Sequence, residues 1–214
     1  MKDNFNQRKK DILSKEDKSS IGKWDEKISS LCDKINSLEN YYTTSSCSGR
    51  VLLMIDQDKK AENLFVFVSH DKISFKELKD ELGKLISITS SHPTRDPAHS
   101  SLTFPSRNRS PTQKGIKNIK FKFEPCILHI ACKTLEDAEK IYEKGKLAGW
   151  KKSGIIELKK NFIVELNASE KIELPIIQDG KLLVDDNFLK IIVDESNTKF
   201  EKVWMKIKKL EEEI

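Results

Sequence analysis

Two pairs of short apolar segments, each joined by a polar turn, restrict the fold of this chain more than any other feature. The first pair spans residues 51–55 and 64–68, and the second spans residues 155–158 and 162–166. Connections this short join antiparallel neighbours, because a parallel crossover needs about a dozen residues or more. We therefore expect two β-hairpins within a sheet that is mixed or mostly antiparallel.

Helix signals lie irregularly between these hairpins. Asp25, Ser74 and Thr134 are N-cap residues, and each precedes apolar residues spaced by three and four. A sparse apolar stripe in the first twenty residues predicts a helix on the surface of the body, and residues 188–210 form a long amphipathic pattern. Helices that alternate irregularly with hairpins predict an α+β fold.

The glycine content argues against a dinucleotide-binding fold. Only 8 glycines are present, and none forms a Gly-x-Gly-x-x-Gly turn between a strand and a helix. A chain of 214 residues accommodates one substantial core. We expect a single α+β domain over residues 1–214 that is not of Rossmann type. A strand followed by a capped helix occurs around residues 67–85 and again around 127–147, which is the pattern of an internal duplication.

Residues 87–118 have no sustained apolar period and contain four of the six prolines. Most of the excess of basic residues in the chain, whose net charge is +5, lies here and in the strand that follows. A segment of this kind binds phosphate with little sequence preference and with strong salt dependence, and a solvated loop that binds nothing has the same composition. We expect a long basic loop within the domain.

The chain carries no sign of a membrane or of an oxidising compartment. No apolar run approaches the roughly 20 residues of a spanning helix, and the N-terminal residues lack the apolar core of a secretory signal. The 4 cysteines are too few and too scattered for a disulfide framework. The expected location is the cytoplasm.

Residues 42–50 read Tyr-Thr-Thr-Ser-Ser-Cys-Ser-Gly-Arg, so six of these nine residues carry a hydroxyl group, and the stretch directly precedes an apolar run. Gly49 permits a positive φ or a close approach, and Arg50 supplies a planar fork of donors. The hydroxyl groups of Ser45 and Ser46 complete what an anion-binding loop requires. A Ser/Thr-rich turn with a surface arginine has the same residues, and residue types alone favour that turn.

Cys126, His129 and Cys132 have a spacing that suggests zinc ligands. The intervening residues read as a strand, however, whose period of two places His129 on the face opposite both cysteines. We expect two buried thiols and a separate histidine, with no metal site.

The stretch at residues 42–50 and the apolar strand after it resemble the signature of the wybutosine-synthesising protein three family of archaea and eukaryotes. Further blocks that are similar to that family follow in order between about residues 19 and 197. They are Gly22, Asp25 and Asn36, then Val68-Ser69-His70, Phe123 to His129, Gly149 to Ile155, Glu173-Leu174-Pro175 and Ser196-Asn197. Residues 87–118 have no counterpart among these blocks.

The resemblance implies an S-adenosylmethionine-dependent methyltransferase. Its substrate would be the tricyclic wyosine-type guanosine beside the anticodon of phenylalanine tRNA, methylated at ring nitrogen N4. S-adenosylmethionine is the implied cofactor and tRNA the implied partner, with no membrane and no obligate protein partner. We expect the cofactor-binding residues to be Ser45, Ser46, Cys47, Gly49 and Arg50. The anion that they hold is either the carboxylate of the cofactor or a phosphate of the tRNA.

His70 and His129 are the expected catalytic residues, because histidine titrates near neutral pH and can accept the proton of the ring nitrogen. A purely structural role for either histidine is the alternative. The expected substrate-binding residues are Tyr42, Lys120, Lys122, Glu124, Trp150 and Ser153. Trp150 either stacks on the base or caps the core, and the core is slightly favoured. We expect His70, Glu124, His129 and Ser153 to converge on residues 42–50.

Two other functional classes fit part of the pattern. A non-catalytic tRNA-binding module would use the hydroxyl groups and Arg50 to hold phosphate, and binding of S-adenosylmethionine discriminates between the two. A hydrolase with Ser46 or Cys47 as nucleophile fits poorly, because the sequence has no Gly-x-Ser-x-Gly elbow and no evident triad partner.

Overall fold

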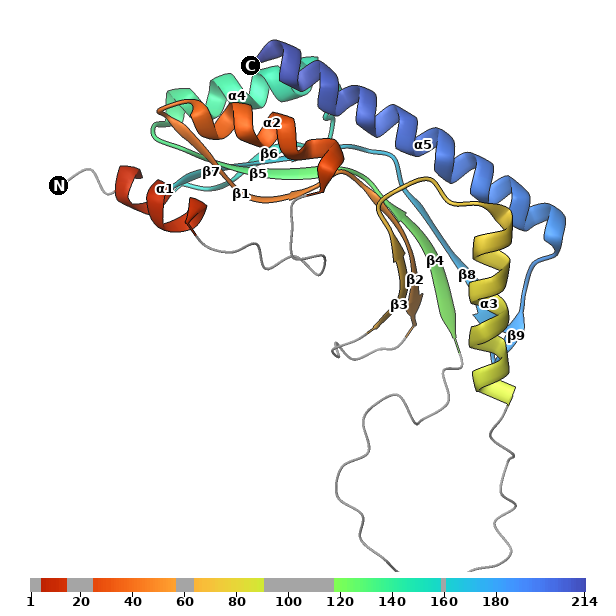
Figure 1. Ribbon diagram of the computed structural model, residues 1–214. Coiled ribbons are helices and arrows are strands. Elements are labelled where there is room, and N and C mark those ends of the chain that lie inside the picture. Colours follow the sequence, from red (N-terminus) through yellow and green to blue (C-terminus); the bar gives the residue numbers. More distant parts are fainter. Residues whose placement is uncertain (1–4, 15–24, 57–63, 91–117, 159–160) are drawn as a thin grey trace, which may run out of the picture.

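Two antiparallel sheets form a continuous arch, with most of the helices on its outer side (Figure 1). The computed structural model describes residues 5–14, 25–56, 64–90, 118–158 and 161–214, to which the structural statements below apply. The first sheet contains β1 (Tyr41–Cys47), β5 (Ile127–Cys132), β7 (Phe162–Asn167) and β6 (Gly154–Glu157), in that order. The second contains β3 (Phe65–Ser69), β2 (Arg50–Ile55), β4 (Ile119–Glu124), β8 (Ile172–Gln178) and β9 (Lys181–Leu182), in that order.

The helices are α1 (Phe5–Leu13), α2 (Glu26–Ser37), α3 (Phe75–Ser90), α4 (Leu135–Leu147) and α5 (Asp186–Glu213). The α+β prediction is confirmed, and so are both hairpins, β2 with β3 and β6 with β7. The strands form two sheets where one was expected, and every described strand pair is antiparallel. The two strand–helix units are present in non-equivalent places, since β3 is a sheet edge and β5 is interior. An internal duplication therefore gains no support.

The predicted helix starts are confirmed. Asp25 accepts from the backbone N–H of Lys27, and Thr134 and Asp137 form a capping box at α4. Ser74 and Glu77 likewise bond each other's backbone N–H groups. Helix α3 continues to Ser90, so the first residues of the predicted loop 87–118 are helical. The loop prediction for residues 91–117 lies outside the described residues.

The chain crosses between the two sheets at three places, two of which lie side by side. Strand β1 leads into β2 through Ser48 and Gly49, and β4 leads into β5 through a bend at Pro125. Because Arg50 pairs with Glu124 in one sheet and β1 pairs with β5 in the other, these two crossovers face each other. We call this region the junction.

Gly49 makes the junction possible. Its φ is +103°, which side chains other than glycine adopt at a cost. A Cβ atom at this position would lie 3.3 Å from the carbonyl oxygen of Glu124 and 3.4 Å from Cγ2 of Val203. Glycine thus supplies both the backbone conformation and the space that the two crossovers need.

Each sheet has a face that packs on the helices and an opposite face, which we call the inner face. In β4 the face that packs on the helices carries Ile119, Phe121 and Phe123, all fully buried. Lys120 and Lys122 stand between them in the sequence and therefore lie on the inner face. Helix α1 lies on the inner side of the first sheet, where Phe5 packs on Tyr42 with ring centroids 5.1 Å apart. This agrees with the prediction of a helix on the surface of the body.

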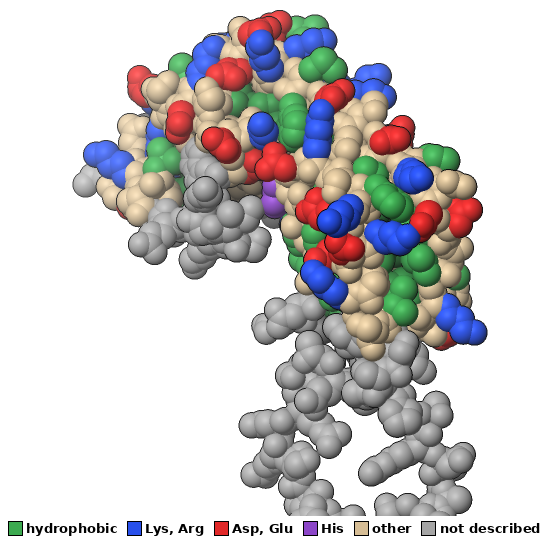
Figure 2. Space-filling view, turned by 45° about the vertical axis from the view of Figure 1, so that its right-hand side comes forward, with side chains coloured by type: hydrophobic (Ala, Val, Ile, Leu, Met, Phe, Trp, Pro, Cys, Tyr) green, Lys and Arg blue, Asp and Glu red, His purple; other side chains and the backbone are tan. Residues whose placement is uncertain are grey.

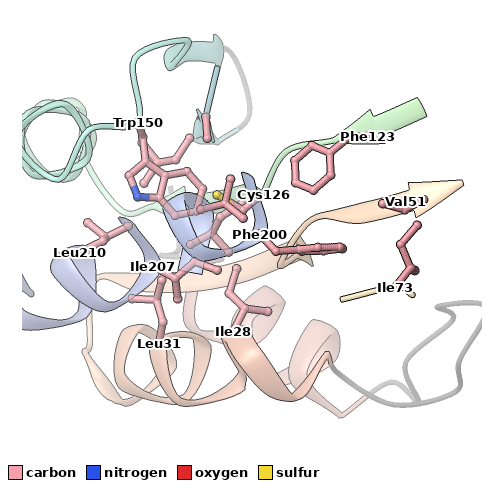
Figure 3. Close-up of a cluster of buried hydrophobic side chains, with 14 of the residues drawn as sticks. Ile28, Leu31, Val51, Ile73, Phe123, Cys126, Trp150, Phe200, Ile207 and Leu210 are labelled. Carbon is pink, nitrogen blue, oxygen red and sulfur yellow. The ribbon is translucent and has the colours of Figure 1, made fainter. Parts of the chain in front are cut away.

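The core lies between the sheets and helices α2, α3, α4 and α5, and Figure 3 shows a part of it. Helix α5 follows the arch and contacts both halves. Its Phe200 meets Phe123 edge to face at 4.9 Å, and its Ile207 and Leu210 are buried near Trp150. Within the described residues, no helix combines the length and the apolar character that crossing a membrane requires.

Candidate functional site

The side chains predicted to form the site gather on the inner face at the junction. Figure 2 shows a histidine side chain in the hollow where the two halves of the arch meet. Three groups of contacts make up the site: one around Asp25 and His70, one around Arg50 and Glu124, and one around His129 and Glu165. Each group joins residues from strands or helices that are distant in the sequence.

Asp25 is the centre of the first group. Its Oδ2 accepts hydrogen bonds from the backbone N–H and the hydroxyl group of Ser48, with the N–H bond at 3.0 Å, and lies 3.2 Å from Nδ1 of His70. The Sγ atom of Cys47 lies 3.8 Å from the same nitrogen. The N-terminus of α2, the junction and the end of β3 are thereby fixed to one another.

These contacts control protonation. The hydrogen bond to Asp25, together with the contact to Cys47, raises the pKa of His70 to about 9. Burial opposes ionisation of Asp25, but the hydrogen bonds from His70 and Ser48 outweigh it and lower the pKa of Asp25. At neutral pH His70 is therefore a cation beside a carboxylate. Its contacts use Nδ1, so Nε2–H is a second donor of the imidazolium.

Asp25, Cys47 and His70 also bring three atoms of metal-ligand type within 4.8 Å of one another. Such a set can hold a divalent ion. In this structure, however, the hydrogen bonds that Oδ2 of Asp25 accepts from Ser48 and His70 account for the arrangement without an ion. We therefore treat the cluster as a hydrogen-bonded network.

Arg50, the first residue of β2, forms the second group with Glu124, the last residue of β4. Its Nε and Nη2 atoms both lie 2.7 Å from Oε2 of Glu124, and these contacts do not involve Nη1. The guanidinium carbon lies 5.1 Å from the ring centroid of Phe65 on the neighbouring strand. Arg50 is thus held in place by protein groups, with part of its fork left to meet a ligand.

The third group is a row across the first sheet. Ser45, His129 and Glu165 are register partners on β1, β5 and β7, so their side chains share the inner face. Nε2 of His129 lies 2.9 Å from Oε2 of Glu165, and both side chains are partly exposed. The expected convergence of His70, Glu124 and His129 on residues 42–50 is therefore confirmed.

Residues 42–50 do not form the turn that residue types alone favoured. Residues 41–47 are strand β1, and they pair with β5. Ser45 and Cys47 face the inner side, whereas Ser46 faces the buried thiol of Cys32 on α2. Tyr42 is 2% exposed beneath α1. Among the residues of this stretch that were predicted to bind a ligand, Ser45, Cys47 and Arg50 are therefore the ones whose side chains a ligand on the inner face can reach directly.

Trp150 and Ser153 lie apart from the junction. The indole ring of Trp150 is fully buried and donates its N–H to the carbonyl oxygen of Lys206 at 3.2 Å. Trp150 therefore belongs to the core and does not stack on a substrate base, since neither face of its ring is exposed. The hydroxyl group of Ser153 donates to the carbonyl oxygen of Trp150 at 2.6 Å and accepts from the N–H of Asn167 at 3.2 Å. These bonds close the turn before β6, so the expected convergence does not extend to Ser153.

Lys120 and Lys122 lie on the inner face of the second sheet, as an RNA-binding role requires. Lys120 pairs with Asp56 at 3.0 Å and Lys122 with Glu173 at 3.2 Å. Their role towards tRNA stays a prediction.

The predicted separation of His129 from the two cysteines is confirmed. Cys126 and Cys132 are buried in the core, and burial raises the pKa of both thiols. His129 is on the opposite, inner face, where it meets Glu165.

Sequence reasoning missed the site roles of three residues, which are Asp25, Glu165 and Phe65. Asp25 was identified as a helix cap, which it is, but its contacts with His70 and Ser48 join positions over twenty residues apart. For Glu165, strand alternation was an available signal, because its neighbours in β7 are apolar and buried. Phe65 carried no signal, since an apolar residue in a hairpin strand is expected to be buried.

Comparisons with known proteins agree with the resemblance described above. A family model described as "Methyltransferase TYW3" matches residues 7–214. A protein of Thermococcus sibiricus named tRNA(Phe) 7-((3-amino-3-carboxypropyl)-4-demethylwyosine(37)-N(4))-methyltransferase is 32% identical over 97% of this chain and 92% of its own length. A protein of the same name from Methanocaldococcus jannaschii is 34% identical over 91% and 88%. The solved structure of the PH1069 protein from Pyrococcus horikoshii superposes with a TM-score of 0.75 at 31% identity, covering 98% of this chain and 93% of the other.

Proposed function

This chain belongs to the methyltransferase TYW3 family, and on that premise we propose that it transfers a methyl group from S-adenosylmethionine to ring nitrogen N4 of a 4-demethylwyosine-type base in phenylalanine tRNA. The observation that carries the proposal is the junction itself. There, on one inner face, the fold assembles a cation–carboxylate pair, an arginine–glutamate pair and a histidine–glutamate pair from separate sequence blocks. The match to the family spans these blocks.

The charged groups at the junction fit the methyl donor. S-adenosylmethionine presents a carboxylate, an ammonium group, a sulfonium group and a flat adenine ring, and when bound it supplies an electrophilic methyl group. Arg50, through Nη1, and His70, through Nε2, are donors for the carboxylate. Glu124 and Glu165 offer negative charge to the cationic groups. Phosphate of the tRNA is the other anion that Arg50 and His70 suit.

The two histidines then have different roles. The ring nitrogen must lose its proton as it gains the methyl group, so the site needs one acceptor close to it. His70, protonated beside Asp25, is suited to donate a hydrogen bond to an anion. His129, whose Nε2 is held by Glu165, has Nδ1 left to accept the proton. Neither Cys47 nor Ser45 needs to act as a nucleophile, because direct transfer has no covalent enzyme intermediate.

A methyl-transfer assay on isolated tRNA tests the proposal. Phenylalanine tRNA from cells that lack this gene would be incubated with the protein and methyl-labelled S-adenosylmethionine, and its nucleosides analysed by mass spectrometry. We expect the base beside the anticodon to gain one methyl group. Binding of the tRNA without any transfer would instead establish a non-catalytic RNA-binding module and contradict the proposal.

Two variants test the roles of individual residues in the same assay. Arg50→Lys keeps the positive charge but loses the planar fork, and we expect kcat/KM to fall by roughly 10- to 100-fold with the folded state intact. His129→Asn should lower kcat more than it raises KM, because it removes the group that accepts the proton of the ring nitrogen. Lys140→Ala, at an exposed position on the outer helix α4, is the control and should leave the rate unchanged.

A further inference from the structure

Phe65 is an aromatic ring that the fold leaves outside its core. It is 47% exposed, although it begins a strand whose partner β2 is largely buried. Its register partner is Met54, which lies on the same face of β2 as Arg50 and Leu52. The register shift between Leu53 and Met54 is a bulge, and it brings Phe65 onto this face although Phe67 pairs with Leu53 on the core face. Phe65 thus lies on the inner face of the second sheet, on the side of the arch that carries the candidate site.

Arg50 fixes one side of this ring. Its guanidinium carbon lies over the ring at 5.1 Å from the centroid, within the range of a cation–π contact. The guanidinium group is in turn held by two 2.7 Å contacts with Glu124. Since the cation covers one face of the ring, the exposed area of Phe65 belongs to its other face and edge.

The neighbours of Phe65 give it an amphipathic setting. Val68, on the same strand and face, is 37% exposed, and its register partner is Leu52. On β4, which lies on the other side of β2, Lys122 and Glu124 occupy the same inner face. An apolar platform bordered by a fixed cation and charged groups suits a ligand that is flat and aromatic and also carries polar edges.

We propose that Phe65, backed by Arg50, is a stacking platform for a purine-type ring. The inference rests on the proposed methyl transfer, which supplies two such rings: the adenine of the methyl donor and the tricyclic target base. Stacking of a base on an aromatic side chain requires a preformed, exposed face, and it tolerates different bases because each has a π-surface. Phe65 is largely exposed and its ring is held by Arg50, so it fits both conditions.

Binding measurements on variants test the platform without catalysis. S-adenosylhomocysteine and unmethylated phenylalanine tRNA would each be titrated against wild type, Phe65→Leu, Phe65→Tyr and Phe188→Ala. Leucine keeps the apolar contact but has no π-face, so we expect Kd for one of the two ligands to rise by roughly 5- to 150-fold, as loss of one stacked base does. Tyrosine should restore binding. Phe188, a phenylalanine that is 42% exposed at the start of α5, is the matched control and should have no effect.

The ligand affected identifies the ring. A loss confined to S-adenosylhomocysteine assigns the platform to adenine, and a loss confined to tRNA assigns it to the target base. A Phe65→Trp variant adds a direct signal, because its indole fluorescence should be quenched by the ligand that stacks on it, whereas Phe188→Trp should not respond.

The inference fails if Phe65→Leu binds both ligands as tightly as wild type, or if leucine and tyrosine weaken binding equally. Either result leaves the proposed methyl transfer intact, provided that wild-type protein still methylates the tRNA. Absence of methylation by wild-type protein, with normal stacking at Phe65, would instead contradict the proposed function alone.

Discussion

Residues 42–50 and residues 149–154 are both polar segments that resemble blocks of the same family, and both were expected to contribute to the site. The first segment ends at the junction and presents Ser45, Cys47 and Arg50 to the inner face. The second turns away from that face, with Trp150 in the core and Ser153 bonded to the backbone around it. Of two segments that resemble blocks of the family, the first therefore faces the site and the second serves the fold, and burial separates the two cases.

The largest expected effect is a loss of protein stability when the second segment is changed. Trp150→Ala removes a fully buried indole and its hydrogen bond to Lys206, and should lower the free energy of unfolding by about 3–5 kcal/mol. Urea unfolding measures this loss. A variant that kept wild-type stability but lost tRNA binding would contradict the structural role of the second segment, because Trp150 would then belong to the site.

The next effect concerns the first segment and its link to Asp25. The pKa of His70 is raised from 6.5 to about 9, so protonated His70 stabilises the folded state. This contribution to the free energy of unfolding is fully present below pH 6.5 and is lost as pH rises through about 9. We expect the folded protein to lose about 2–3 kcal/mol over this range through His70. The free energy of unfolding of wild type should exceed that of His70→Asn at pH 6, and the gap should close by pH 10. A gap that is independent of pH would contradict the ion pair.

A substitution at Gly49 tests whether the first segment also contains a residue that stabilises the fold. Gly49→Ala places a Cβ atom at a φ of +103° and against the crossover at Glu124, and should cost about 1–2 kcal/mol. Gly83→Ala is the control, because its Cβ atom meets nothing within 4 Å and its position in a helix favours alanine. Thermal unfolding of the two variants should therefore move in opposite directions.

The smallest effect is predicted for Ser153. Ser153→Ala removes a hydroxyl group that bonds only backbone atoms in the described structure, and should cost about 1 kcal/mol. Its methylation rate should equal that of wild type at a temperature where both are folded. A selective loss of rate at unchanged stability would move Ser153 from the turn to the site.

Local patterns in the sequence predicted the elements but not their arrangement. Caps such as Asp25 and Thr134, and the two hairpins, are determined by neighbouring residues, so periodicity and capping rules found them. The division into two sheets depends on the crossovers at Gly49 and Pro125, which bring together residues far apart in the chain. The contacts of Asp25 with His70 and of His129 with Glu165 arise only after that division, which is why the site residues were recognisable but their partners were not.

The junction has a consequence for how the protein folds. Its contacts join Asp25 to His70, and Arg50 to Glu124 across 74 positions, so the site has a high contact order and should form late. A chain released from the ribosome before β5 has emerged would lack one wall of the hollow and could not bind substrate productively. Specific activity should therefore follow the fraction of molecules in which both sheets are complete, whereas helix content alone should not report that fraction.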